Sequence, residues 1–184
     1  MNKTAKIIGL ILGVFALLIA IFAGTFFVTY NYVLNNLPKQ TFESPAPERF
    51  TIAALEKSKG AFEDQLAFHS EQALADGRKP FVYFSATWCP PCQVIKKTID
   101  DPLMVDAFSG TYIIQVDIDD WEDEISESDF WVWSIPAFDE VDEFGRPTGY
   151  AIDGGEWEED IPENIAPVLK EYFNSGQNRL EASR

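Results

Sequence analysis

The chain is poor in basic residues, histidine and cysteine, and each shortage excludes a class of function. Its 184 residues include 14 Lys and Arg against 30 Asp and Glu, a formal net charge of −16. Nucleic-acid binding draws on clustered Lys and Arg, so this composition argues against a nucleic-acid partner. One His and two Cys offer too few ligands for a metal site and too few thiols for a disulfide-stapled scaffold. We therefore expect no nucleic acid, no metal and no cofactor.

The first 30 residues lack acidic side chains altogether. No Asp or Glu precedes Glu43, and the stretch from Ile7 to Val28 carries no charge and has no polar face. A helix of that length, rising about 1.5 Å per residue, would be about 33 Å long and would cross a bilayer core of about 30 Å. Because basic residues mark the cytoplasmic side, Lys3 and Lys6 place residues 1–6 in the cytoplasm.

A cleaved signal peptide is the alternative interpretation of this segment. The apolar core of such a peptide runs about 7–15 residues and ends at small residues spaced as in A-x-A. The apolar run is longer here, and Ala20, Ala23 and Gly24 give no convincing cleavage site. We therefore expect residues 7–30 to be an uncleaved single-pass anchor in the inner (cytoplasmic) membrane, with the rest of the chain on the periplasmic side.

A linker and a tail bound one domain. Residues 31–49 contain three prolines and no hydrophobic periodicity, which is typical of a semi-extended spacer. Residues 174–184 have the composition of a flexible tail. Residues 50–173 have the length of one ordinary domain with its own core.

Helix-like and strand-like segments alternate within that domain. Apolar spacing and turn residues predict strands at 81–86, 111–118 and 137–141, a turn at 142–145, and helices at 62–74, from Cys92 to a break near Pro102, and at 162–173. This alternation predicts an α/β fold, in which helices cover a sheet.

The two cysteines lie at a predicted strand-to-helix junction, in the sequence Trp88-Cys89-Pro90-Pro91-Cys92. A thiol at a helix N-terminus faces unpaired N–H groups and the positive end of the helix dipole, so its thiolate is stabilised. Pro90 suits the first helical turn, whereas Pro91 stiffens the loop and removes a donor. We expect Cys89 to be exposed and reactive, and Cys92 to be shielded one turn inside the helix.

Three other roles for the cysteines fit the sequence less well. A structural disulfide would close a loop too short to restrict the unfolded chain much. A metal site would need more ligands, and His69 lies well outside the motif. Two inert buried cysteines would not need a flanking Trp and two prolines. The sequence therefore favours a redox role for the two cysteines.

The stretches FVYFSATWCPPC, QVDID and SIPAF together resemble the thioredoxin superfamily, over residues 60–173. The likeness is greatest to bacterial membrane-anchored or periplasmic thiol-disulfide oxidoreductases. It implies a thioredoxin fold, with a central mixed sheet flanked by helices, in which Cys89 attacks and Cys92 resolves. The substrate groove and its surroundings would comprise Trp88, Pro90, Pro91, Ile135 and a cis Pro136.

The sequence departs from that family where protons are handled. The buried Asp usually found six residues before the first cysteine is Tyr83 here, and its Lys partner is Gln115. Glu140, on the same strand face as Phe138, is a candidate replacement proton acceptor. The alternative is that Asp139 and Glu140 are solvated carboxylates on a short strand.

Aromatic and acidic residues gather before Pro136. Trp121, Phe130, Trp131 and Trp133 form an aromatic cluster. Alternation along the chain places Trp131 and Trp133 on the face opposite Val132. These side chains either pack in the core or form an exposed contact for the substrate. The acidic runs at 117–129 and 153–163 are either plain solvated surface or a means of selecting basic partners.

These observations predict a membrane-anchored, exported thiol-disulfide oxidoreductase that acts on protein thiols and disulfides. The tether and the resemblance favour a reductase supplied by a membrane electron donor, although C-x-x-C proteins span about −270 to −120 mV. The alternative is a non-catalytic module of the same fold, which holds a partner through its aromatic groove and acidic surface.

Overall fold

The computed structural model describes residues 50–175. The expected cytoplasmic N-terminus, anchor (residues 7–30) and linker (residues 31–49), and all but the start of the tail, lie outside the described residues. Within residues 50–175, no helix is long and apolar enough to cross a membrane.

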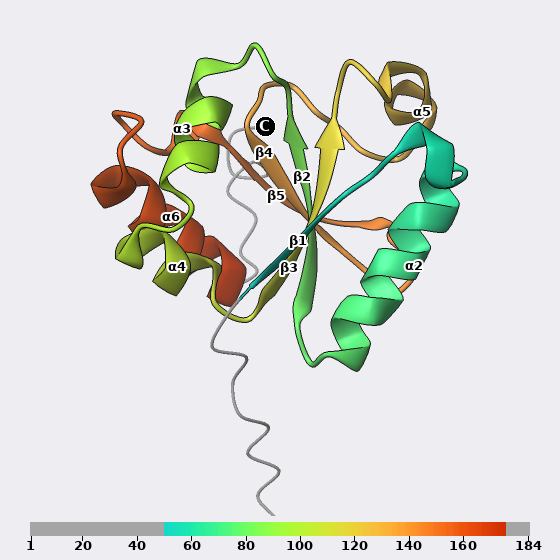
Figure 1. Ribbon diagram of the computed structural model, residues 1–184, viewed down its shortest axis with the longest axis horizontal. Coiled ribbons are helices and arrows are strands. Elements are labelled where there is room, and N and C mark those ends of the chain that lie inside the picture. The colour runs from blue at the N-terminus through green and yellow to red at the C-terminus, as the bar shows by residue number, and fades with distance from the viewer. Residues whose placement is uncertain (1–49, 176–184) are drawn as a thin grey trace, which may run out of the picture. The chain divides into compact units, whose positions relative to one another are not determined.

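A five-stranded mixed sheet forms the centre of the described domain, as the resemblance implied (Figure 1). The strand order is β1-β3-β2-β4-β5. β1 and β2 both run parallel to β3, whereas β4 is antiparallel to β2 and β5 is antiparallel to β4. The strands are β1 (Thr51–Ala54), β2 (Lys79–Ser85), β3 (Thr111–Asp117), β4 (Ala137–Val141) and β5 (Pro147–Asp153).

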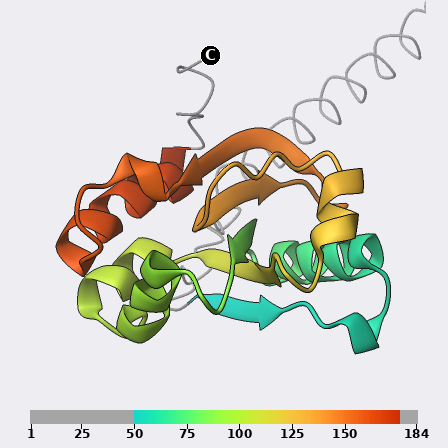
Figure 2. The ribbon, with the colours of Figure 1, turned by 90° about the horizontal axis from the view of Figure 1, so that it is seen from above.

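Helices cover both faces of this sheet. Figures 1 and 2 show α3, α4 and α6 on one face and α2 and α5 on the other. The helices are α2 (Phe62–Ala75), α3 (Pro90–Thr98), α4 (Pro102–Phe108), α5 (Glu122–Glu127) and α6 (Pro162–Ser175), with short 3-10 turns η1 (Lys57–Lys59) and η2 (Gly154–Glu156). The last helix therefore runs two residues into the segment expected to be tail.

The alternating side chains of β2 fill two separate cores. Phe81 and Tyr83 pack with Phe138 in the core under α3, α4 and α6. Val82 and Phe84 pack in the core under α2. Burial on both faces explains why this strand is almost continuously apolar in sequence. Each fully buried large apolar side chain contributes about 1.5–3 kcal/mol to the stability of the folded domain. The strand ends just before the cysteine motif, so a strand with six of its seven residues buried positions the chemistry.

Local signals set the ends of the helices. The expected break near Pro102 is confirmed: α3 ends at Thr98, and the Asp101 carboxylate caps α4 by accepting a 2.9 Å hydrogen bond from the Leu103 N–H. The 142–145 turn ends at Gly145, whose φ of 77° favours glycine.

Candidate active site

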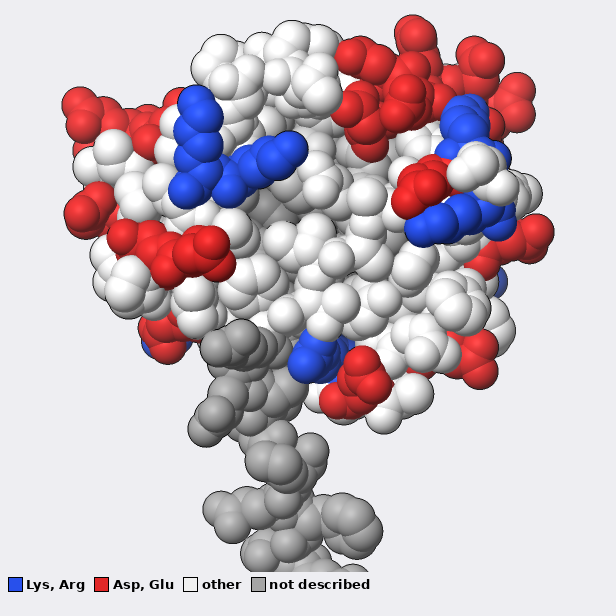
Figure 3. Space-filling model, in the orientation of Figure 1, with Lys and Arg blue, Asp and Glu red and all other residues white. Residues whose placement is uncertain are grey.

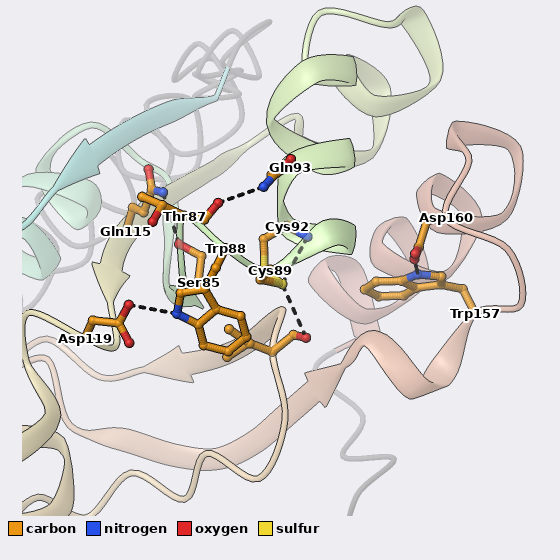
Figure 4. Close-up of a disulfide and its surroundings, with 11 residues drawn as sticks. Ser85, Thr87, Trp88, Cys89, Cys92, Gln93, Gln115, Asp119, Trp157 and Asp160 are labelled. Carbon is orange, nitrogen blue, oxygen red and sulfur yellow. Dashed lines mark hydrogen bonds between the residues drawn. A yellow bond between two sulfur atoms is a disulfide. The ribbon is translucent and has the colours of Figure 1, made fainter.

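Cys89 and Cys92 form a disulfide at the start of α3, with their Cα atoms 5.3 Å apart (Figure 4). Cys89 is the N-cap residue, and its Sγ accepts a 3.3 Å hydrogen bond from the Cys92 N–H. Pro90 and Pro91 have no N–H, so the Cys92 amide is the first helical donor that follows Cys89. The motif therefore aims one backbone donor at the sulfur expected to attack.

Both cysteines are buried, at 2% exposed for Cys89 and 4% for Cys92. The expectation of an exposed Cys89 is wrong for the oxidised protein. Its sulfur is covered because the pair packs against Ile118, which follows β3, and Ile135, which precedes β4. Cys89 Sγ lies 3.7 Å from the Ile135 carbonyl oxygen. A partner must displace part of this cover to reach the sulfur.

The Ile135–Pro136 peptide bond is cis, as the resemblance implied. Ile135 is half-buried and packs against the disulfide cluster, and the next residue, Pro136, is buried. The Pro136 carbonyl accepts a 2.9 Å hydrogen bond from the Gly154 N–H, and a Cβ added to Gly154 would lie 3.1 Å from Pro136 Cδ. The start of η2 therefore holds the proline loop in place.

Trp88 flanks the disulfide as an exposed side chain. Its Nε1–H donates a 2.8 Å hydrogen bond to Asp119 Oδ2, which comes from the segment after β3 (Figure 4). Pro90 is exposed and Pro91 is half-buried. The structure thus brings Trp88 and the two prolines to the disulfide together with the cis-proline loop.

The positions of the expected proton-handling pair hold no base. Tyr83 is buried and stacks on Phe138, with ring centroids 4.5 Å apart, and burial raises the pKa of its phenol. The Gln115 side chain donates a 3.1 Å hydrogen bond to Ser85 Oγ. Neither side chain accepts a proton at neutral pH.

A cavity of about 130 Å³ beside Cys92 brings two other titratable groups close to the disulfide. Lys96 of α3 and Asp117 at the end of β3 line it, together with Tyr83 and Gln115. Sequence reasoning missed both groups. Two signals were present: Lys96 stands one helical turn after Cys92, and the ends of adjacent parallel strands meet at one sheet edge.

Glu140, the replacement base considered from the sequence, lies elsewhere. It pairs with Phe81 in the sheet, about 10 Å along β4 from its start, and its Oε2 accepts a hydrogen bond from the Thr148 hydroxyl. The structure does not bring it to the disulfide. Its neighbour Asp139 is the buried carboxyl, and burial raises the pKa of Asp139 to about 7. The expectation of solvated carboxylates is therefore wrong for Asp139.

The aromatic residues before Pro136 divide into core and surface. Trp121 is buried and packs on Phe62, with ring centroids 5.3 Å apart, and Phe130 is buried beside them. Trp131 and Trp133 are 57% and 72% exposed and stack on each other at 5.1 Å. The second pair is therefore available as a contact surface.

Comparison with known proteins identifies the family. A thioredoxin-like family profile matches residues 61–140. The thioredoxin of Ophiophagus hannah is 36% identical over 75 residues, which are 41% of this chain and 68% of that protein. The chain belongs to the thioredoxin-like superfamily. The thioredoxin of Equus caballus is 33% identical over 94 residues, covering 48% of this chain and 80% of that protein.

Solved structures of thioredoxin-like proteins also align with the chain. A disulphide isomerase from Xylella fastidiosa Temecula1 aligns over 72% of this chain and 98% of its own, with 14% identity and a TM-score of 0.47. The thioredoxin-like profile includes both cysteines and Pro136, so the matched region holds the site described above.

Proposed function

We propose that this thioredoxin-like protein is a membrane-anchored, exported oxidoreductase that reduces disulfides in other proteins. One observation carries the proposal: a C-x-x-C disulfide caps a helix directly beside a cis-proline loop, between Trp88 and Ile135. A disulfide that serves stability alone does not require an exposed Trp and a cis-proline loop beside it.

The reaction consists of two thiol-disulfide exchanges. In the reduced protein, the Cys89 thiolate attacks one sulfur of the substrate disulfide, and the other substrate sulfur leaves as a thiolate that takes a proton from solvent. The Cys92 thiol then loses its proton and attacks Cys89 Sγ. This forms the Cys89–Cys92 disulfide and releases the second substrate thiol, so two electrons pass to the substrate. A dithiol-bearing membrane partner then reduces the Cys89–Cys92 disulfide by two further exchanges, which supply two new electrons and leave the partner oxidised to its own disulfide.

Two local features support Cys89 as the attacking residue. It precedes the first turn of α3, where the helix dipole favours negative charge, and the Cys92 N–H already points at its sulfur. The formal net charge of −16 opposes a thiolate, but salt screens exposed charges beyond about 8–10 Å. The helix terminus is in contact with the sulfur, so its effect is the larger one locally.

Trapping of partners tests the proposal. Cys92→Ser in the full chain should accumulate covalent complexes that survive denaturation and disappear on adding reductant, because the mixed disulfide has no resolving thiol. Cys89→Ser is the matched control and should trap little. Equal trapping by both variants, or none by either, would contradict the assigned roles. Full function without both thiols would instead support the non-catalytic binding module.

The direction of electron flow has its own test. A reductase should have a potential close to about −270 mV, the value of thioredoxin, rather than about −120 mV, that of a strong oxidant. Equilibration of the full chain with glutathione or dithiothreitol buffers measures it. A value near the oxidising limit would reverse the direction proposed here.

The location is proposed from the apolar residues 7–30. Membrane fractionation should recover the chain with the membrane, and protease added from the periplasmic side should reach residues 50–184. A soluble mature form beginning near Gly24 would show a cleaved signal peptide instead.

A further inference from the structure

A groove of about 650 Å³ opens next to the disulfide and follows α5. Its near end is formed by Ile118, which packs against the cysteine cluster, and by Asp119, which binds the indole of Trp88. Phe130 and Trp131 line it farther along. A chain whose cysteine is joined to Cys89 would therefore have this groove within reach.

A second groove, of about 460 Å³, continues the first. The two share Ser128, Asp129 and Phe130, and the second ends at Phe144 and Arg146 on the turn between β4 and β5. Together they form a path along one side of the domain that is longer than a single side chain requires. An extended peptide segment fits this shape better than a compact ligand does.

Acidic side chains are found along both grooves. Figure 3 shows acidic side chains crowded over α5, beside an uncharged surface at the loop from β2 to α3. Among residues 50–175, Arg146 is the one basic residue that lines either groove, and it is already paired with Asp142 at 2.8 Å. The acidic residues that line the two grooves are Glu63, Asp64, Asp119, Glu122, Glu127 and Asp129.

The exposed aromatic pair supplies a second contact for a cation. Trp131 lines the first groove, and Trp133 stacks on it at 5.1 Å. A guanidinium or ammonium group over the face of an exposed Trp gains about 0.5–1 kcal/mol. The apolar stems of Arg and Lys also suit a groove with an aromatic wall.

We propose that this groove selects substrates in which Arg or Lys and an apolar residue lie within a few residues of the target cysteine, in an extended segment. The inference rests on the proposed function, since it assigns the substrate class of the same site. Acidic residues supply the charge preference, the Trp pair supplies a stacking face, and the disulfide at the groove's end sets the register.

The test compares two cysteine-free peptides that are identical except for two Arg or two Glu flanking one Leu. Binding to the oxidised full chain is measured by calorimetry. Thiol-disulfide exchange cannot occur, because the peptides contain no cysteine and both cysteines of the protein are in the disulfide. The Arg peptide should bind at least about 10-fold more tightly, because two exposed charge pairs and one cation–π contact each contribute up to about 5-fold. The preference should shrink as salt rises from about 50 to 500 mM.

Matched variants locate the effect. Glu122→Gln and Asp129→Asn should each weaken Arg-peptide binding about 3-fold. Glu71→Gln and Asp100→Asn remove the same charge from exposed positions outside both grooves and should leave binding unchanged. Equal affinity for the two peptides, or equal losses in all four variants, would overturn the inference.

A kinetic arm separates this inference from the proposed function. For this arm each peptide is remade with one added cysteine, which is held in a mixed disulfide with a small thiol, and is offered to the reduced full chain. Arg-selective binding without reduction would leave the groove assignment standing and remove the reductase function. Reduction with no preference between the peptides would leave the reductase function standing and remove the groove assignment.

Discussion

Cys92 and Asp117 line the same cavity of about 130 Å³, with Lys96 at its α3 side. A cavity needs only about 10–15 Å³ of such volume to hold a water molecule, so water can bridge the thiol and the carboxylate. Tyr83 occupies the position where the family usually has an acid, and it is buried against Phe138. The proton that leaves Cys92 in the second exchange therefore has Asp117 as its nearest carboxylate acceptor within this cavity.

Asp117→Asn should slow the second exchange about 10- to 100-fold, the usual range for general-base assistance. Attack by Cys89 on the first substrate sulfur should change by less than about 2-fold, since Asp117 lines the cavity beside Cys92. Stopped-flow reaction of the reduced protein with an aromatic disulfide separates the two steps, because each releases one coloured thiol.

Glu140→Gln is the matched control for that measurement. It removes a carboxylate from a strand position whose side chain is bound to Thr148, so both exchanges should keep their rates. Slow release of the second thiol in Glu140→Gln, with normal release in Asp117→Asn, would assign the proton acceptor to Glu140.

Pro91→Ala should stabilise the Cys89 thiolate. The substitution restores an amide N–H in the first turn of α3, where the Cys92 N–H is at present the first donor after Cys89. Hydrogen bonds to charged groups contribute about 1.5–3 kcal/mol, so the midpoint of Cys89 alkylation against pH should fall by about one unit. Pro102→Ala, the same change at the start of α4, should leave the midpoint unaltered.

An unchanged midpoint in Pro91→Ala would show that the new donor does not face the sulfur. If the new N–H donates to the sulfur as expected, the same variant should also have a more oxidising potential, because the hydrogen bond stabilises the thiolate of the reduced form.

The sequence predicted the parts of the fold in which one local signal was sufficient. The run from Phe81 to Ser85 is apolar on both faces and folds as the central strand β2. Two strands and one α-helix were missed. β1 has four residues, β5 is an edge strand that contains Pro147 and Gly149, and α5 is a six-residue helix with an acidic first turn. Their structure depends on pairing or packing with distant segments, which local patterns do not contain.

The site divides in the same way. The motif identified Cys89 and Cys92, and the cis state of Pro136 followed from the resemblance. The burial of Cys89 depends on Ile135, 46 positions away, so no local pattern contained it. The difference between buried Asp139 and half-buried Glu140 depends on what covers each face of β4, which the sequence of β4 does not contain.

Gly145→Ala should destabilise the domain by at least about 3 kcal/mol. A left-handed residue other than glycine costs about 1–2 kcal/mol, and the added Cβ would lie 2.6 Å from Leu66 Cβ and 2.7 Å from the Leu66 carbonyl carbon of α2. Gly149→Ala is the control: its φ is also positive, at 90°, but nothing lies within 4 Å of the added Cβ.

Gly149→Ala should therefore lower the free energy of unfolding by only about 1–2 kcal/mol, which is the cost of the left-handed conformation alone. Urea unfolding of the two variants measures the difference. Equal losses would mean that the turn shifts away from α2 without cost.

Asp139 should make the domain less stable as pH rises. It pairs with Val82 on β2 and Ala151 on β5, and burial raises its pKa from 3.8 to about 7. Between these two values the folded chain keeps a proton that the unfolded chain has lost. The free energy of unfolding should therefore fall from about pH 4 to about pH 7 and then level off, by about 4 kcal/mol in total at 1.36 kcal/mol per unit.

Asp139→Asn isolates this contribution from the general repulsion within an acidic protein. The amide resembles the protonated acid, so the variant should match the parent near pH 4 and exceed it by a few kcal/mol at pH 8. Asp120→Asn removes the same charge from an exposed position and should keep the parent's slope. Urea unfolding of the three proteins across this pH range checks the prediction. An Asp139→Asn curve parallel to the parent's would mean that the buried carboxyl does not titrate in this range, because the strand opens to solvate it.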